Sequence, residues 1–166
     1  MVRVPDARVD RLTALYRPKR TVYAQVQFVD TVAGAPQGKP GRGPDLFAAV
    51  RQCDALAIVL REFDATPDQA TRDLRTLEAE LILNDLAVVE GRIERIEKEL
   101  KVGKRQNEQE HALLARLKTA LESERPLRAE TLSTEEEKLV RGFQMLSRKS
   151  LLVIHNQGSP ARRRLP

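Results

Sequence analysis

Residues that build disulfides and metal centres are scarce in this sequence. The single cysteine, Cys53, allows no intramolecular disulfide and no cysteine-based metal cluster. The two histidines, His111 and His155, are far apart and have no spacing typical of a metal site or of a cysteine–histidine pair. Metallohydrolase and thiol chemistry therefore find little support in the sequence.

Aromatic residues and long hydrophobic runs are also scarce. Aromatic side chains make up 4% of the chain and tryptophan is absent, which argues against a β-sandwich and against a base-stacking surface. No apolar run reaches the ~18 residues of a membrane span, and the N-terminus MVRVPDARVD does not resemble a secretory signal. We therefore expect a soluble cytoplasmic protein with no membrane partner. Because 32% of the residues are charged, helices with solvated faces should dominate.

Positive charge is concentrated at the end of the chain. The net charge is +5, and three of these charges come from Arg162, Arg163 and Arg164, so that +2 remains without them. The composition is thus weak evidence for nucleic-acid binding by the folded part. Residues 157–166 are predicted to form a disordered basic tail.

A glycine-rich segment, FVDTVAGAPQGKPGRG at 28–43, follows a β-patterned run. Residues 22–29 alternate between apolar and polar, as in a strand with one buried face, so Asp30 is predicted at its carboxyl end. A carboxylate there can hold Mg²⁺, and glycine N–H groups can approach phosphate oxygens. The alternative is a flexible surface loop. Upstream, a short strand within 1–5 and a helix at 9–16 are expected.

Two apolar runs further along predict buried strands. Residues 55–60, ALAIVL, and 151–154, LLVI, have strand length and no alternation, which favours burial on both faces. A short helix with Leu46, Phe47, Val50 and Cys53 should precede the first run, with Asp45 as its cap. His155 and Asn156 would then lie at the carboxyl end of the second strand. The order strand, loop, helix, strand indicates a βαβ arrangement.

Between these strands the sequence predicts an antiparallel helical hairpin over 66–125. Thr66 and Pro67 form a helix start, with Gln69 reaching back to the cap. Heptad spacing then predicts a seam facing a second helix at 106–124, after a break at Gly103. The seam consists of Ala79, Ile82, Leu86, Val89, Ile93, Ile96 and Leu100, and its partner stripe of Leu114, Leu117 and Leu121, flanked by Leu113 and Ala120.

A further helix should follow the hairpin. Its signal is a capping box at 133–136, and Leu139, Val140, Phe143 and Leu146 are expected to face inward. The hairpin is therefore predicted to be inserted into an α/β domain.

In this order, the segments resemble the YchF-type ATPase/GTPases of the Obg-related P-loop group over nearly the whole chain. The matching phrases include PDARVDRLTALYRPKRT, QFVD with its following Ala-Gly, FAAVRQCDALAIVLREF and LSTEEEKLVRGFQMLSRKSLLVIHN. The family's Glu-Leu-x-Leu-x-Asp-Leu phrase is matched by Glu80, Leu81, Leu83, Asp85 and Leu86. The resemblance implies an incomplete P-loop-type G domain (1–65 and 126–156) carrying an antiparallel coiled-coil hairpin at 66–125.

The resemblance also implies Mg²⁺-dependent hydrolysis of ATP or GTP and association with ribosomes. Asp30 matches the switch II aspartate that helps hold Mg²⁺, and Gly34 matches the glycine whose N–H meets the γ-phosphate. Asn156 matches the first residue of the Asn-x-x-Glu base-recognition motif. The segment departs from the family in two ways, because Asp30 and Gly34 are one residue further apart than in the motif and Ser159 replaces the acidic residue.

The phosphate-binding motif itself does not occur in the sequence. There is no Gly-x-x-x-x-Gly-Lys-Ser/Thr, and the segment 38–43 is no substitute because Pro40 has no N–H to donate. Nor does any segment of the sequence resemble the family's TGS domain. We therefore expect a truncated or degenerate nucleotide-binding protein with weak or no hydrolysis, which is either monomeric or weakly associated through open sheet edges. The alternative is a non-enzymatic module whose coiled-coil hairpin binds a ribosomal or protein partner.

Overall fold

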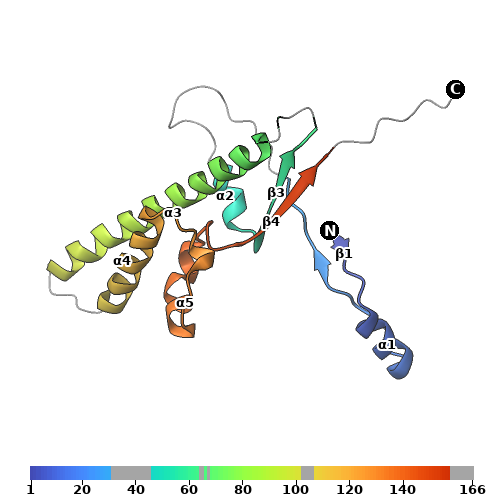
Figure 1. Ribbon diagram of the computed structural model, residues 1–166. Helices are drawn as coiled ribbons and strands as arrows, with labels where there is room; N and C mark the ends of the chain where they lie inside the picture. The colour runs from blue at the N-terminus through green and yellow to red at the C-terminus, as the bar shows by residue number, and fades with distance from the viewer. Residues whose placement is uncertain (31–45, 64–65, 67, 102–106, 158–166) are drawn as a thin grey trace. The chain divides into compact units, whose positions relative to one another are not determined.

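A computed structural model describes residues 1–30, 46–63, 66, 68–101 and 107–157 (Figure 1). The chain divides into two compact units, Met1–Leu46 and Phe47–Pro166. Among the described helices, none is both long enough and apolar enough to cross a membrane.

The first unit contains a two-stranded antiparallel sheet and one helix. β1 (Val2–Arg3) pairs with β2 (Gln25–Val26), and α1 (Ala7–Tyr16) lies between them in the chain. The side chain of Asp6 caps α1 by accepting a hydrogen bond from the Arg8 backbone N–H at 2.8 Å. The short strand and the helix are therefore confirmed.

The strand predicted at 22–29 is much shorter in the structure. Only Gln25–Val26 pair as a strand, and Val22, Val26 and Phe28 are exposed. The alternation correctly marks extended backbone, but within the described part of this unit no second layer packs on either face. Burial of one face is therefore wrong for this unit.

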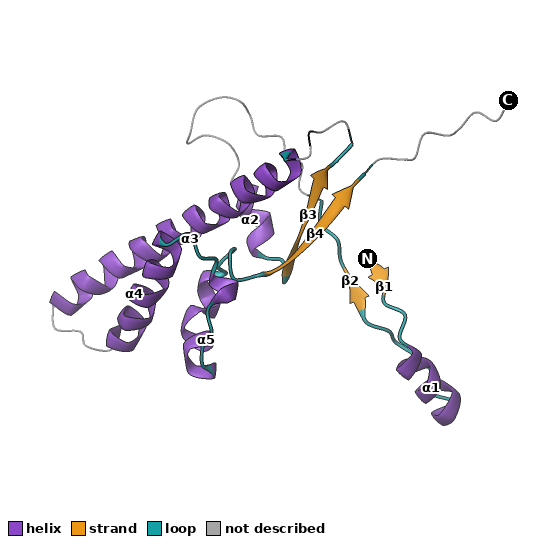
Figure 2. Ribbon diagram, viewed as in Figure 1, coloured by secondary structure: helices purple, strands orange, loops and turns teal. Residues whose placement is uncertain are grey.

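In the second unit, two parallel strands form the sheet. β3 (Ala55–Arg61) pairs with β4 (Ser150–Asn156) along its whole length, from Ala55 opposite Ser150 to Arg61 opposite Asn156 (Figure 2). The α/β character is confirmed. The intervening chain is mostly helical, and α2 (Leu46–Arg51) precedes β3; Cys53 lies just beyond this helix.

Burial of these strands on both faces was predicted and is wrong. Leu56, Ile58 and Leu60 are buried, whereas Val59 is 63% exposed and Leu152 61% exposed. The buried face packs against α2 and α3 through the side chains of Phe47, Val50, Ala70, Leu74, Leu77 and Leu81. Within the described part of the second unit, no element covers the other face.

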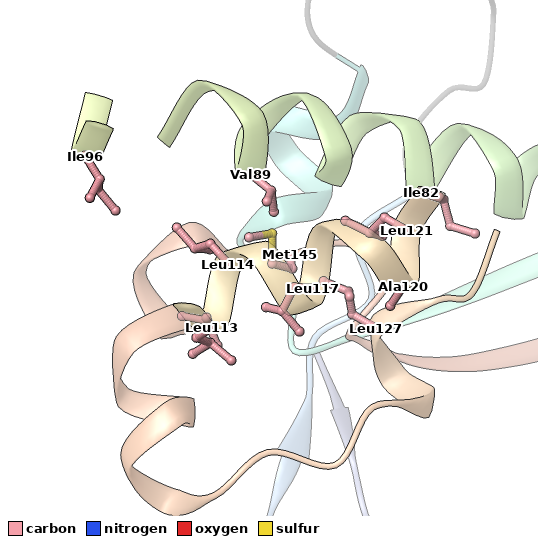
Figure 3. Packing of buried hydrophobic residues seen from close by; sticks show 11 residues of the cluster. Ile82, Val89, Ile96, Leu113, Leu114, Leu117, Ala120, Leu121, Leu127 and Met145 are labelled. Atoms are coloured by element: carbon pink, nitrogen blue, oxygen red, sulfur yellow. The ribbon is translucent and has the colours of Figure 1, made fainter. Parts of the chain in front are cut away.

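Two long helices form the largest core cluster. α3 (Gln69–Lys101) and α4 (Glu108–Glu122) run antiparallel, and α4 packs against the C-terminal part of α3 (Figures 1 and 3). The predicted α4 stripe is entirely buried, and the α3 seam is buried or partly buried except for Ala79, which is exposed. Ala79 lies toward the end of α3 that extends beyond α4, where Leu74, Leu77 and Leu81, rather than Ala79, face the strands and α2.

The beginning of α3 also differs from its prediction. The helix starts at Gln69, whose backbone N–H donates to the Thr66 carbonyl oxygen at 2.9 Å. The Gln69 side chain donates forward to Asp73 at 2.7 Å instead of back to Thr66. Pro67, Gly103 and Asp45 lie outside the described residues.

After α4 the chain returns to the sheet through short helices. These are the 3-10 helix η2 (Leu127–Ala129), α5 (Thr134–Val140) and the 3-10 helix η3 (Arg141–Phe143). The capping box is confirmed, with Ser133 Oγ accepting from Glu136 N–H and the Glu136 carboxylate accepting from Ser133 N–H. Val140 and Leu146 are buried and Phe143 is partly buried, but Leu139 is exposed, because it lies about 100° around α5 from Val140, the residue of this helix that faces the core.

Candidate functional site

Asp30 is exposed and lies four residues after β2 in the first unit. It makes no hydrogen bond or ion pair with any other described residue, so its carboxylate is accessible as an oxygen ligand. Gly34, the other residue of the predicted phosphate contact, lies outside the described residues. The predicted pair therefore cannot be assembled into one described site.

Asn156 is the last residue of β4, at the carboxyl end of the parallel pair, as predicted. Its carbonyl oxygen accepts a hydrogen bond from Glu62 N–H at 2.9 Å. The carboxyl ends of parallel strands are where α/β proteins bind ligands. Asp30 and Asn156 belong to different units.

Glu62 brings further polar side chains to this strand end. Its carboxylate contacts His155 Nδ1 and accepts a hydrogen bond from Gln157 Nε2 at 3.2 Å. The contact with His155 contributes most, and that with Gln157 next, to holding the pKa of Glu62 below its usual value. Nearby in the chain, the Arg61 guanidinium lies 5.9 Å from the centre of the Phe63 ring.

Sequence reasoning missed Glu62. The available signal was its position directly after the apolar run, where a polar residue falls at a strand end. His155 was predicted only at the carboxyl end of the strand, and its contact with Glu62 gives it a specific partner.

Asp85 is the most deeply buried carboxylate among the described residues. It is 0% exposed and accepts hydrogen bonds from Leu146 N–H at 2.8 Å, Ser147 N–H at 2.7 Å and Ser147 Oγ at 2.6 Å. Arg51 Nη1 lies 4.0 Å from the same carboxylate. Burial raises the pKa of Asp85, and the bonds from Ser147 and Leu146 oppose this shift.

The contacts of Asp85 join three elements near the sheet. α3 is tied to the turn before β4 through Ser147, whose Oγ also accepts a hydrogen bond from Leu127 N–H at 3.2 Å. Lys149 Nζ donates to the carbonyl oxygens of Arg51 at 3.0 Å and Cys53 at 2.5 Å, which fixes the end of α2 to the start of β4. We therefore interpret Asp85, Ser147 and Lys149 as residues that stabilise the fold.

The described residues fit a magnesium–nucleotide site only in part. They contain no group of three or more histidine, cysteine, aspartate or glutamate side chains that could hold a metal alone. Mg²⁺ bound with nucleotide needs only one or two protein carboxylates, because phosphate oxygens and water complete its octahedron. The accessible Asp30 is suited to that role.

Comparison with known proteins identifies relatives over nearly the whole chain. The chain is 36% identical to the ribosome-binding ATPase YchF of Bacillus subtilis, covering 94% of this chain and 45% of that protein. It is 31% identical to the protein of the same name from Escherichia coli O157:H7, covering 94% of this chain and 46% of that protein. It is 32% identical to Obg-like ATPase 1 of Oryza sativa subsp. indica, covering 93% and 42%.

The fold comparison agrees with the sequence comparison. The structure of the Schizosaccharomyces pombe YchF GTPase superposes with a TM-score of 0.75 at 26% identity, covering 95% of this chain and 46% of that one. No family model matches the sequence. The chain thus spans slightly less than half the length of these relatives. Over 94% of its length, the chain is therefore homologous to slightly less than half of the YchF-type, Obg-related proteins named as ATPases and GTPases.

Proposed function

We propose that this chain forms part of a YchF-type nucleotide-binding region and that, by itself, it binds ATP or GTP weakly and hydrolyses neither. Homology to ATPases and a GTPase over nearly the whole chain is the observation that carries this proposal. The parallel strand pair that ends at Asn156 also supports it, because nucleotides in such regions bind at the carboxyl ends of parallel strands.

Asp30 is the residue proposed to hold Mg²⁺, directly or through water. Magnesium in such a site would neutralise the phosphate charge that develops during phosphoryl transfer. Gly34 is proposed to donate its N–H to the γ-phosphate, and Asn156 to contact the base.

Weak activity is expected because the sequence has no motif that binds the phosphates and neutralises their charge. Phosphoryl transfer depends on positioning and on neutralisation of charge, and both require a backbone cradle and a lysine for the phosphates. The sequence contains no Gly-x-x-x-x-Gly-Lys-Ser/Thr. We therefore expect the 28–43 segment to act as a switch II that responds to a γ-phosphate held by other residues.

Calorimetric titration of the full chain with Mg·ATP and with Mg·GTP tests this proposal. The expected result is no binding in the micromolar range and no phosphate release. Micromolar affinity for either nucleotide would overturn it. Asp30→Asn provides the internal comparison: if micromolar binding were found and this variant abolished it, Asp30 would be a metal ligand in a functional site.

A second candidate function is a non-enzymatic interaction module. The observation in its favour is that α3 and α4 supply most of the largest core cluster, so that the proposed insertion, 66–125, has a hydrophobic seam of its own. The relatives named as ribosome-binding make a ribosomal partner, and with it a cytoplasmic location, the natural proposal.

Co-sedimentation of the full chain with ribosomes, without nucleotide, tests the module. The variant Arg95→Glu/Lys98→Glu reverses charge on exposed residues near the far end of α3, and Arg72→Glu/Arg75→Glu makes the same change near its beginning. Loss of binding in the first variant alone would place the contact at the far end of the helix pair. No association of the unaltered chain would count against the module.

A further inference from the structure

The base-recognition motif of this chain lacks its acidic residue. The motif begins at Asn156, and Ser159 occupies the position where the resemblance implies a carboxylate. A serine hydroxyl cannot replace a carboxylate as a charged, two-oxygen acceptor of hydrogen bonds. If the motif acted alone, recognition of a base amine would therefore be lost.

A carboxylate reaches the same strand end from the neighbouring strand. Glu62 directly follows β3, and β3 ends opposite Asn156 in the parallel register. Its backbone N–H donates to the carbonyl oxygen of Asn156 at 2.9 Å. Its carboxylate contacts the residues on either side, His155 and Gln157. One residue thus contacts three successive positions of the strand end that begins the motif.

The Glu62 carboxylate keeps capacity for another hydrogen bond. An ionised carboxylate has about four lone-pair sites, and the described contacts use one on each oxygen, from His155 and Gln157. The side chain is 30% exposed, so a ligand can reach it. Glutamate is ionised at neutral pH, and the contacts with His155 and Gln157 lower the pKa of Glu62 further, which favours the form that only accepts hydrogen bonds.

We propose that Glu62 replaces, from the adjacent strand, the acidic residue that Ser159 does not supply, and that it accepts a hydrogen bond from the exocyclic amine of a purine nucleotide. The ligand class is therefore an adenine or guanine nucleotide, in preference to a purine without an amine. This inference rests on the proposed nucleotide-binding function.

NMR titration of the full chain at millimolar ligand tests the inference. The probes are AMP and GMP, which carry the amine, and purine riboside 5′-monophosphate, which does not. One charge-assisted hydrogen bond predicts roughly tenfold weaker binding of the probe without the amine. Glu62→Gln should abolish this difference. Glu137→Gln, which alters an exposed glutamate paired with Arg148, should preserve it.

A measurement without nucleotide separates failure of the inference from failure of the proposed function. In the unliganded chain, Glu62→Gln should shift the side-chain amide signals of Gln157, and Glu137→Gln should not. Unchanged Gln157 signals would show that the contact is absent and would overturn the inference. Equal binding of all three probes, or no binding of any, would also overturn it, whereas the calorimetric test with Mg·ATP and Mg·GTP judges the proposed function independently.

Discussion

Asp85 shows how one residue can join parts of the chain that are far apart in sequence. Its carboxylate is fully buried and is satisfied by hydrogen-bond donors at Leu146 and Ser147, 61 and 62 positions away. In the sequence, Asp85 was notable only as part of a phrase shared with a family. A charged residue among apolar neighbours gives no indication of which distant donors will satisfy it, because tertiary packing selects them.

We predict that Asp85→Ala destabilises the protein by ~2–4 kcal/mol, because it leaves the Leu146 and Ser147 N–H groups buried without an acceptor. Urea denaturation followed by circular dichroism measures the loss. Glu80→Ala, an exposed change on the same helix, is the control and should cost less than ~0.5 kcal/mol. Equal losses in the two variants would mean that the Asp85 contacts do not stabilise the fold.

The pH dependence of stability provides a second test of Asp85. Because burial raises its pKa, the folded chain binds this proton more tightly than the unfolded chain. Stability should therefore fall as the pH rises from the unfolded value of about 3.9 through the folded pKa, and then level off. Asp85→Asn cannot titrate at this site, so this component should disappear from its free energy of unfolding measured against pH. The same slope in both proteins would contradict the raised pKa.

Local signals predict helix ends better than strand environments. The capping box at Ser133 needs only residues three positions apart, and it forms as predicted. The expected inward position of Leu139 is wrong, because burial depends on which face of α5 packs on the core, and Val140 rather than Leu139 lies on that face. The Glu136 carboxylate accepts a bond from Ser133 N–H, which together with Arg116 keeps the pKa of Glu136 below its usual value.

Ser133→Ala should destabilise α5 and the chain by ~1 kcal/mol, since it removes the acceptor for the Glu136 backbone N–H. Thermal or urea denaturation measures the change. Thr134→Ala is the neighbouring control; it alters an exposed side chain at the first helical position and should shift stability by less than ~0.5 kcal/mol. If Ser133→Ala matched this control, the cap would contribute nothing measurable.

For the molecule as a whole, the unexpected feature is the open face of the parallel strand pair. Continuous apolar runs usually indicate strands covered on both sides. In the second unit, helices cover one face, and Val59 and Leu152 on the other face remain exposed among the described residues. The strands are thus as apolar as strands covered on both faces, although the described residues cover only one face.

The two faces should respond differently to truncation. Leu151, which packs against the buried clusters, should lose roughly 2 kcal/mol of stability on substitution by alanine. Leu152, which is 61% exposed, should lose about 0.5 kcal/mol or less. Urea denaturation of Leu151→Ala and Leu152→Ala makes the comparison. A large loss at Leu152 would show that its face is covered in solution.

The sequence by itself determined the order of the elements, the seam between the two long helices and the cap of α5. These depend on periodicity and on contacts within a few residues, which are visible along the chain. Tertiary structure alone decided which face of β3 is covered, which donors satisfy Asp85, and that Glu62 contacts the residues around Asn156. The contacts of Asp85 and Glu62 join segments more than 60 residues apart, and the covered face of β3 depends on how α2 and α3 pack on it; the residue pattern of one segment specifies neither.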